Sequence, residues 1–217
     1  MAKAKVPHIS HDALRAQSRT YYEQRLRDHG VTPRGVDWNS QESQELRFHQ
    51  LARLLDGYPN ATVLDYGCGF GAMASYLRRR RHLGMYVGFD VSPDMIGAAR
   101  HVTASVADCR LTSDRSSLSP VDFVVSSGVF NVKADAPDEV WRAYIDDSVD
   151  DMRTLSTRGF AFNLLTSNSD PERRRPDLYY ADPLDVFEHC RTRFSRHVAL
   201  LHDYGLYEFT ILVRVSL

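Results

Sequence analysis

The sequence has few cysteines and no long apolar run. Its three cysteines are widely spaced and form no C-x-x-C pair, so neither a disulfide framework nor a zinc site is expected. Nowhere do about eighteen apolar residues run together, and the first residues, MAKAKVPHISHDALRAQ, lack the apolar segment of a signal peptide. These absences predict a cytoplasmic protein with reduced thiols, without membrane contact and without a bound metal.

An excess of charge of one sign is missing too. The 217 residues include 27 Lys and Arg against 28 Asp and Glu, a formal net charge of −1. No global positive field therefore attracts nucleic acid or an acidic membrane, which favours a small-molecule partner. With 43% apolar residues the chain can bury one sizeable core, as a single α/β domain with additions would. One chain leaves the oligomeric state open.

The first part of the chain predicts two helices ahead of any strand. One covers residues 10–28 and begins with a capping serine. The second begins at Ser40 and stops at DGYPN, because glycine and proline break the helical pattern there. Together they predict an N-terminal helical cap, residues 1–58.

The remainder, residues 59–217, alternates between strand-like runs and helices and is predicted to be the cofactor-binding domain, forming one structural unit with the cap. Such alternation implies right-handed crossovers and a parallel sheet. The last two β-rich runs, RHVALLHDY and YEFTILVRV, are separated by little more than Gly205 and predict a hairpin. The other expected strands are 61–66, 85–90, 102–107, 121–127 and 159–167, and the expected helices are 70–81, 93–100, 137–155 and 183–192. The predicted fold class is α/β and Rossmann-like. It has a mostly parallel seven-stranded sheet with an antiparallel C-terminal hairpin strand, helices on both faces and an N-terminal helical lid.

The stretch VLDYGCGFG, residues 63–71, places three glycines at alternate positions directly after an apolar strand. In open α/β sheets the ligand lies at the carboxyl ends of the strands, and glycines in the first βα turn let it approach the backbone. Asp90 ends the second predicted strand 19 residues beyond Gly71, about where a carboxylate accepts hydrogen bonds from ribose hydroxyls. The alternative is that Asp90 only caps the helix that starts at Ser92 or Pro93.

Asp65 distinguishes a nucleotide from a cationic ligand. A pyrophosphate on this loop would meet a carboxylate of the same sign, at a cost of roughly 4 kcal/mol for an effective dielectric constant of about 20. The G-x-G-x-G spacing is also one residue tighter than the dinucleotide fingerprint. Both observations favour a cationic ligand that carries a ribose, and both disfavour a nucleotide-dependent oxidoreductase of Rossmann topology.

Two of these segments resemble a known family. VLDYGCGFGAMASYL resembles motif I of class I S-adenosylmethionine-dependent methyltransferases, and YVGFDVSPDMIGAAR resembles the segment that follows it there. The resemblance continues through VADC and VDFVVSSGVFNV and covers about residues 60–217. It implies S-adenosylmethionine as the cofactor. The implied contacts are Asp65, Gly67, Cys68, Gly69 and Gly71 with the methionine part, Asp90 with the ribose, Val91 and Met95 with the adenine face, Asp108 and Cys109 with the adenine edge, and Ser127 and Gly128 near the transferable methyl. For Asp108 the alternative is a turn carboxylate.

Methyl transfer depends on positioning more than on a base. Holding the reactants in attack geometry supplies roughly 7–11 kcal/mol, whereas a positioned base gives about 3–5 kcal/mol. Asn131, just beyond the fourth predicted strand, could orient an acceptor. His202, Asp203 and Tyr204 lie in the turn HDYG, which is expected at the same edge of the sheet as the glycine loop. The alternative for these three is an ordinary polar hairpin turn.

Two segments are candidates for the acceptor site. Residues 169–183 form a loop that is long for a compact domain, as substrate loops tend to be. The cap is expected to close over the cofactor and exclude water, with an amphipathic helix packed on the sheet as the alternative. The candidate residues are Arg173, Arg174 and Arg175 for an anionic acceptor, Tyr179 and Tyr180 for the pocket wall, and Trp38, Gln44 and Arg47 for closure over the cofactor. The alternatives are a solvated loop for the arginines and ordinary packing for the tyrosines.

The predicted function is methyl transfer from S-adenosylmethionine to an oxygen or nitrogen of a small polar, anionic metabolite. The alternatives are the oxidoreductase, a non-catalytic binding module and a nucleic-acid methyltransferase. An N-P-P-[YF] motif of amino-base methyltransferases is missing, and SSGVFN stands at that position.

Overall fold

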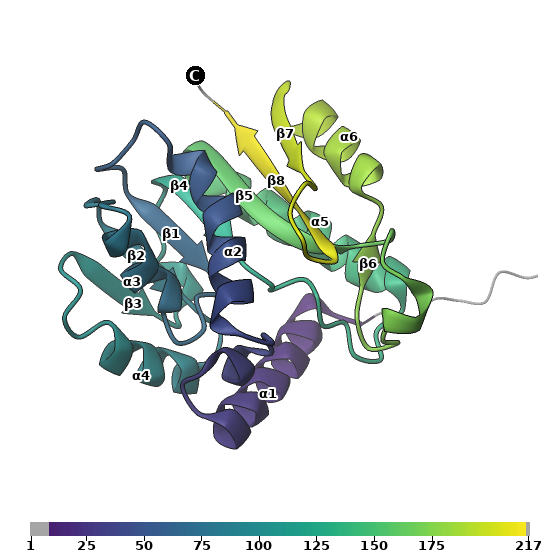
Figure 1. Ribbon diagram of the computed structural model, residues 1–217, viewed down its shortest axis with the longest axis horizontal. Helices are drawn as coiled ribbons and strands as arrows, with labels where there is room; N and C mark the ends of the chain where they lie inside the picture. Colours follow the sequence, from purple (N-terminus) through teal and green to yellow (C-terminus); the bar gives the residue numbers. More distant parts are fainter. Residues whose placement is uncertain (1–8, 216–217) are drawn as a thin grey trace, which may run out of the picture.

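Eight strands form one mixed sheet in the computed structural model, which describes residues 9–215 (Figure 1). The strand order is β3-β2-β1-β4-β5-β8-β7, and β6 pairs with β5. The strands are β1 (Val63–Tyr66), β2 (Tyr86–Phe89), β3 (Cys109–Thr112), β4 (Val121–Ser126), β5 (Ser156–Thr166), β6 (Tyr180–Ala181), β7 (His197–Leu201) and β8 (Glu208–Arg214). β8 is antiparallel to both of its neighbours, whereas β1 to β6 pair in parallel. Strand order reverses between β1 and β4, and such a switch point is where α/β sheets bind ligands.

Helices cover both faces of this sheet. They are α1 (His11–His29), α2 (Gln41–Ala52), α3 (Ala72–Arg79), α4 (Pro93–Val102), α5 (Asp138–Thr154) and α6 (Pro183–Arg193), with short 3-10 turns η1 (Pro33–Val36), η2 (Arg53–Leu55), η3 (Arg115–Ser117) and η4 (Pro171–Arg173). Neighbouring residues of β1 point to opposite faces, so Val63 packs with α2 and α3 while Leu64 packs with α5 and α6. The predicted fold class is therefore confirmed, with one more short strand than the seven expected.

The predicted cap, residues 1–58, has two structurally different parts from residue 9 on; residues 1–8 lie outside the described range. α1 runs along the carboxyl edge of the sheet (Figure 1). Its first turn is capped by Ser10, whose Oγ accepts a hydrogen bond from Ala13 N at 3.3 Å. α2 instead contributes Phe48 and Leu51 to the same buried cluster as the strand residues, so it is a layer of the core. Only α1 and η1 are placed as a lid would be.

The predicted strand 102–107 is wrong. α4 continues to Val102, and β3 begins only at Cys109. Asp108 lies just before β3 with a φ of 50°, and its carbonyl accepts a hydrogen bond from Tyr86 N at 2.8 Å. Because Asp108 turns the chain into β3, it stands at the amino end of that strand, opposite the expected ligand edge.

The strand β6 was not predicted either. It has two residues inside the loop 169–183. These residues pair with the carboxyl end of β5, where Leu165 lies opposite Tyr180. Two residues carry no periodic signal, so only tertiary pairing defines this strand.

Within residues 9–215 there is also no helix with the length and apolar character needed to cross a bilayer.

Candidate active site

The glycine loop joins β1 to α3 and is tied to the end of β2. The backbone amides of Gly67 and Cys68 both donate to the Phe89 carbonyl, at 2.7 and 2.9 Å. Gly67 has a φ of 83°, and a Cβ there would lie 2.1 Å from Cγ2 of Val129. Only glycine satisfies both the backbone conformation and this close approach. Gly71 opens α3 and faces Thr103 of the neighbouring helix end, so it serves packing rather than the cavity.

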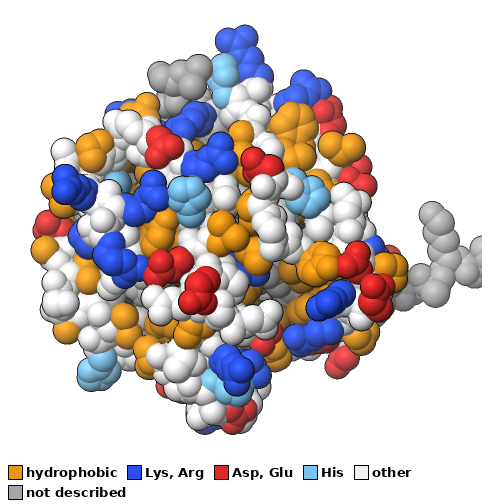
Figure 2. Space-filling model, in the orientation of Figure 1, with side chains coloured by type: hydrophobic (Ala, Val, Ile, Leu, Met, Phe, Trp, Pro, Cys, Tyr) orange, Lys and Arg blue, Asp and Glu red, His pale blue; other side chains and the backbone are white. Residues whose placement is uncertain are grey.

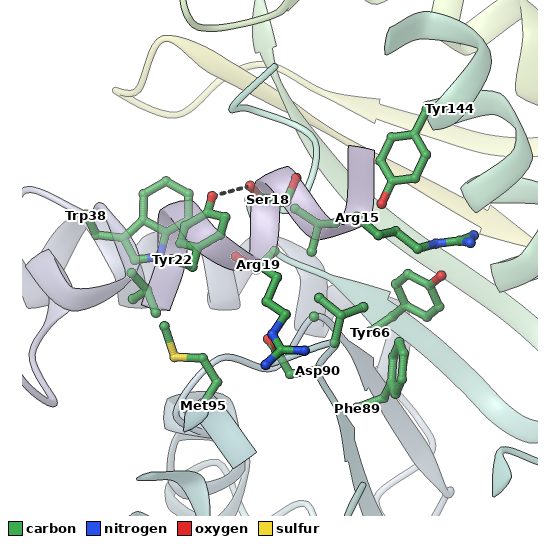
Figure 3. A pocket seen from close by; sticks show the side chains of 16 residues that line it. Arg15, Ser18, Arg19, Tyr22, Trp38, Tyr66, Phe89, Asp90, Met95 and Tyr144 are labelled. Carbon is green, nitrogen blue, oxygen red and sulfur yellow. Dashed lines mark hydrogen bonds between the residues drawn. The ribbon is translucent and has the colours of Figure 1, made fainter. Parts of the chain in front are cut away.

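Two adjoining cavities lie at the carboxyl edge beside this loop. They enclose about 740 and 320 Å³ of space, part of it open to solvent, and Val36, Trp38, Gly67 and Ser127 line both. They lie at the switch point of the sheet, where α/β folds bind ligands. The larger cavity is also lined by Arg15, Ser18, Arg19, Tyr22, Tyr66, Phe89, Asp90, Val91, Met95, Gly128, Val129 and Tyr144 (Figure 3). The smaller is also lined by Gln44, Phe48, Asp65, Cys68, Gly69, Phe70 and Ala72.

Asp90 is held at the base of the larger cavity by two backbone amides. Its Oδ1 accepts from Ser92 N and its Oδ2 from Gly69 N, both at 2.9 Å. Burial raises the pKa of this carboxyl to about 6, although both hydrogen bonds favour its ionised form. Each oxygen keeps a further lone pair that can accept a hydrogen bond. The helix cap is Ser92, whose Oγ accepts from Met95 N, so Asp90 is not needed in that role.

Asp65 lies in the wall of the smaller cavity and is 3% exposed. Tyr86 donates its hydroxyl hydrogen to Oδ2 of Asp65 at 2.6 Å. Burial raises the pKa of Asp65 to about 7, against the opposing effect of this hydrogen bond. A cation in the smaller cavity would favour the ionised carboxylate, whereas an anion would oppose it.

The two cavities meet where Trp38 covers the end of β4. Gly128 has a φ of 77°, and a Cβ there would lie 2.3 Å from Cζ2 of the Trp38 ring. The Gly128 amide donates to Oδ1 of Asn163 at 2.8 Å, and its carbonyl accepts from the Tyr22 hydroxyl at 3.4 Å. Ser127 therefore lines both cavities and Gly128 lines the larger one, and their contact with a transferable methyl stays a prediction.

The helix α1 supplies cavity residues that the sequence reasoning missed. Arg15, Ser18, Arg19 and Tyr22 follow one another at i, i+3, i+4 and i+7 and line the larger cavity (Figure 3). Glu23 accepts hydrogen bonds from both Arg19 Nε and Ser92 Oγ, at 2.7 and 2.8 Å, and so links α1 to the Asp90 loop. This polar stripe at helical spacing is visible in the sequence, but the helix was assigned only as part of the cap. Tyr66 and Tyr144 carried no sequence signal for a site.

The predicted adenine-edge contacts of Asp108 and Cys109 are wrong. Both residues stand where β3 begins, and parallel strands present their carboxyl ends to the ligand. Asp114 is the carboxylate that follows the carboxyl end of β3. Its Oδ1 accepts from Ser116 N at 2.9 Å.

The predicted acceptor residues of the hairpin do not reach either cavity. His202 and Asp203 are exposed, and Tyr204 shares a hydrogen bond of 2.7 Å with Thr210 Oγ1. The hairpin strands lie beyond β5, too far along the sheet from β1 to overhang the glycine loop. Asn131 is 5% exposed and lies outside both linings, and its carbonyl accepts from Tyr179 N at 2.8 Å. The prediction therefore fails for the hairpin turn and finds no support for Asn131.

The loop 169–183 is also placed differently from the prediction. Arg174 Nε donates to the Ser169 carbonyl at 3.1 Å, and Arg175 forms a 2.5 Å ion pair with Asp177. Arg173 is exposed, and none of the three arginines lines either cavity. Tyr180 accepts from Arg175 N, and Tyr179 lines a separate cavity of about 280 Å³ between α5 and α6. The loop does touch the cap, because Arg175 lies 3.8 Å from Asp37.

The three predicted closing residues of the cap differ in position. Trp38 lines both cavities and Gln44 lines the smaller one. Arg47 lines neither, because its guanidinium pairs with Glu208 of β8 at 2.5 Å.

In the described part of the chain, no three His, Cys, Asp or Glu side chains are grouped as a metal site would need.

Comparisons with known proteins agree with this geometry. Residues 38–206 match the family described as "Methyltransferase domain". The chain is 46% identical over 166 residues to Rv1506c of Mycobacterium tuberculosis, a protein whose name describes it as an inferred methyltransferase; the match covers 75% of this chain and 98% of that protein.

Solved structures show the same fold. Magnesium protoporphyrin IX methyltransferase from Synechocystis PCC 6803 with bound S-adenosylmethionine superimposes with a TM-score of 0.66 and 18% identity, over 98% of this chain and 100% of the other. The 1,6-didemethyltoxoflavin N1-methyltransferase of Burkholderia thailandensis with S-adenosylhomocysteine gives 0.62 and 15%, over 98% and 93%. The matching family, the 46% identical relative and the shared fold lead to one conclusion: the chain belongs to the class I methyltransferases, and S-adenosylmethionine is its cofactor.

Proposed function

We propose that the protein methylates an oxygen or nitrogen of a small polar metabolite that carries an anionic group. The observation behind this proposal is the charge in the wall of the larger cavity. Arg15 and Arg19 lie about one helical turn apart on α1 and both line it, while Asp90 is its one acidic lining residue. Each arginine also pairs with an acidic residue of α1 outside the lining, Arg15 with Asp12 at 3.0 Å and Arg19 with Glu23 at 2.7 Å, and an acceptor anion would share these guanidinium groups. Guanidinium groups bind carboxylates and phosphates through charge-assisted hydrogen bonds. This assigns to α1 the anion-binding role that the sequence had suggested for residues 173–175.

The proposed cofactor placement follows the cavity linings. The methionine part would lie in the smaller cavity with Asp65, and the adenosine in the larger cavity, with Asp90 on the ribose and Val91 and Met95 on the adenine. The sulfonium would then lie where the cavities meet, beside Ser127. The fit is supported by Gly67 and Gly69, which line the cavities without a side chain, and by the buried Asp65 carboxylate in the wall of the smaller cavity.

Positioning rather than base catalysis is expected to carry the reaction. Tyr22 lines the larger cavity, and burial raises its pKa far above its usual range, so it stays protonated and donates to the Gly128 carbonyl. A protonated phenol can hold an acceptor oxygen or nitrogen in place but removes no proton. The division into a cap, residues 1–58, and a cofactor-binding domain, residues 59–217, is part of the proposal, with both forming one unit because α2 shares the core of the sheet.

A small acceptor is favoured over nucleic acid. Lys and Arg side chains on the face seen in Figure 2 are interspersed with Asp and Glu, without the unbroken basic stripe that phosphate backbones need. Two neighbours of the same fold are named for small molecules, magnesium protoporphyrin IX and 1,6-didemethyltoxoflavin. Incubating the purified protein with methyl-labelled S-adenosylmethionine and a metabolite extract should label a low-molecular-weight product. Label found only in tRNA or DNA from the same cells would contradict the proposal.

Neutralising either arginine should weaken binding of the acceptor and leave binding of the cofactor nearly unchanged. For Arg15→Gln, and for Arg19→Gln, we expect the KM of the identified acceptor to rise about tenfold, because each removes one charge-assisted contact of roughly 1.5–3 kcal/mol. The Kd of S-adenosylhomocysteine, measured by calorimetry, should change less than about threefold. Arg100→Gln is a matched control, since Arg100 is exposed on α4 and lines neither cavity. Equal effects at Arg15, Arg19 and Arg100 would refute the acceptor site.

Cofactor affinity should rise with pH as Asp65 ionises. Below its pKa of about 7 the carboxyl must lose a proton before it can attract the sulfonium, so affinity should fall by nearly tenfold per pH unit toward pH 5.5. Above about pH 7 the profile should level off. Asp65→Asn should flatten the profile between about pH 6 and 7.5, as calorimetry in buffers of different ionisation enthalpy can show. An unchanged profile in this variant would contradict the role of Asp65.

A further inference from the structure

A buried ion pair joins the cap to the last strand of the sheet. Nε of Arg47 on α2 lies 2.5 Å from Oε1 of Glu208 on β8, and the side chains are 9% and 0% exposed. Burial raises the pKa of Glu208 to about 7, while the guanidinium and the amide of Asn163 oppose that rise. Taking two charges out of water is costly, so a buried pair is weak evidence for stability alone. The contacts that Glu208 and Arg47 make with neighbouring side chains indicate a second role for the pair.

The second oxygen of Glu208 is linked through Asn163 to the loop beside the proposed methyl position. Asn163 Nδ2 donates to Glu208 Oε2 at 2.8 Å, and Asn163 Oδ1 accepts from the Gly128 amide at 2.8 Å. An ionised carboxylate only accepts hydrogen bonds, so it fixes which end of the Asn163 amide faces it. The oxygen of that amide is thereby directed at Gly128. Glu208 thus acts on the β4 loop through Asn163, without touching it.

The cap side of the pair reaches the same loop by another route. The Arg47 guanidinium stacks over the Trp38 ring at 3.9 Å from its centroid, and that ring covers Gly128. Arginine stacked on indole is a favourable cation–π contact, and Arg47 can hold this position because Glu208 neutralises it. Gly128 is therefore held by Asn163 on one side and covered by Trp38 on the other. Glu208 contacts both Asn163 and Arg47 and so connects the two sides.

We propose that Glu208 is a positioning residue that couples the packing of α2, through Arg47 and Trp38, to the geometry of the loop at Gly128. The carboxylate receives Arg47, which places Trp38 over the cofactor site, and it orients Asn163, which fixes the Gly128 amide. The proposal rests on the placement of the methyl beside Gly128. Because the amide of Gly128 can be observed without any ligand, failure of the coupling and failure of that placement are distinguishable.

Backbone amide exchange in the full-length, ligand-free protein tests the coupling directly. In Asn163→Leu the Gly128 amide loses its acceptor, and we expect its exchange to accelerate at least about tenfold. In Glu208→Gln, and in Arg47→Met, we expect an acceleration of similar order, although neither side chain bonds to Gly128. Thr210→Val is the matched control. It removes a buried hydrogen bond two residues along β8, with Tyr204, and should leave Gly128 unchanged.

Affinity for S-adenosylhomocysteine supplies the second measurement. Glu208→Gln and Arg47→Met should each raise its Kd about tenfold, and the double variant should raise it about tenfold rather than a hundredfold, because both changes break one coupling. The double variant leaves no buried charge unpaired, so it keeps the test open if a single variant fails to fold.

The outcomes separate the two ideas. Gly128 exchange in Glu208→Gln and Arg47→Met that equals exchange in Thr210→Val would overturn the coupling. Accelerated exchange with an unchanged Kd would keep the coupling but contradict the placement of the methyl beside Gly128.

Discussion

Replacing Asp90 by alanine should weaken binding of S-adenosylmethionine at least about 100-fold. The carboxylate is expected to accept both ribose hydroxyls, and each hydrogen bond to a charged group contributes roughly 1.5–3 kcal/mol. The substitution also leaves the amides of Gly69 and Ser92 without their acceptor, which loosens the glycine loop. Titration calorimetry with S-adenosylmethionine and S-adenosylhomocysteine measures the loss, and both ligands should lose affinity equally because they share the ribose.

Two further substitutions separate ribose binding from general effects. Asp90→Asn keeps one acceptor oxygen and should lose only about tenfold, as expected for one hydrogen bond. Asp94→Asn changes a carboxylate of the same region that is exposed on the first turn of α4, and should leave affinity within about threefold. Undiminished affinity in Asp90→Ala, with the protein folded, would remove the basis for placing the ribose there.

Gly67→Ala should destabilise the protein by about 2–5 kcal/mol and abolish detectable cofactor binding. The left-handed backbone at φ 83° costs alanine about 1–2 kcal/mol. The new Cβ would also lie 2.1 Å from Cγ2 of Val129, so the loop or the β4 end must shift, at about 1–3 kcal/mol. Denaturant unfolding monitored by circular dichroism measures the first effect, and calorimetry measures the second.

A helical glycine and a rescue variant control this experiment. Gly97 lies within α4, and a Cβ added there would meet no atom within 4 Å, so Gly97→Ala should stabilise the protein by about 0.5–1 kcal/mol. Adding Val129→Ala to Gly67→Ala removes the collision but not the backbone strain, and should restore part of the lost stability. If Gly67→Ala proves as harmless as Gly97→Ala, the tight approach of loop and β4 is not what shapes the site.

The parts predicted from sequence are those fixed by local chemistry. Three alternate glycines after an apolar strand, a carboxylate ending the next strand and alternating elements each follow from neighbouring residues. Asp65, Asp90, Ser127 and Trp38 accordingly line the cavities. The failures involve segments with weak local signals. β3 has four half-buried or exposed residues, so its start was misplaced and Asp108 with it.

The prediction of the acceptor-binding residues failed for a different reason. The residues HDYG and the arginine run are polar and follow strands, as site residues do, but their distance from β1 depends on strand order and loop path. In the fold, Arg174 and Arg175 find carbonyls and carboxylates within their own loop. Arg47 meets Glu208, a residue 161 positions later, and sequence patterns carry no signal for such a pairing.

The sequence by itself determined the fold class and the cofactor, and it predicts the glycine loop as the binding segment, because short segments determine backbone conformation and the order of strands and helices. The tertiary structure alone decided which side chains complete the site. α1 crosses the carboxyl edge and brings Arg15, Arg19 and Tyr22 to the cavity, while the hairpin turn is carried beyond β5. The physical reason is that contacts between elements depend on how whole faces pack, and the free energy of that packing is shared among residues far apart in the chain.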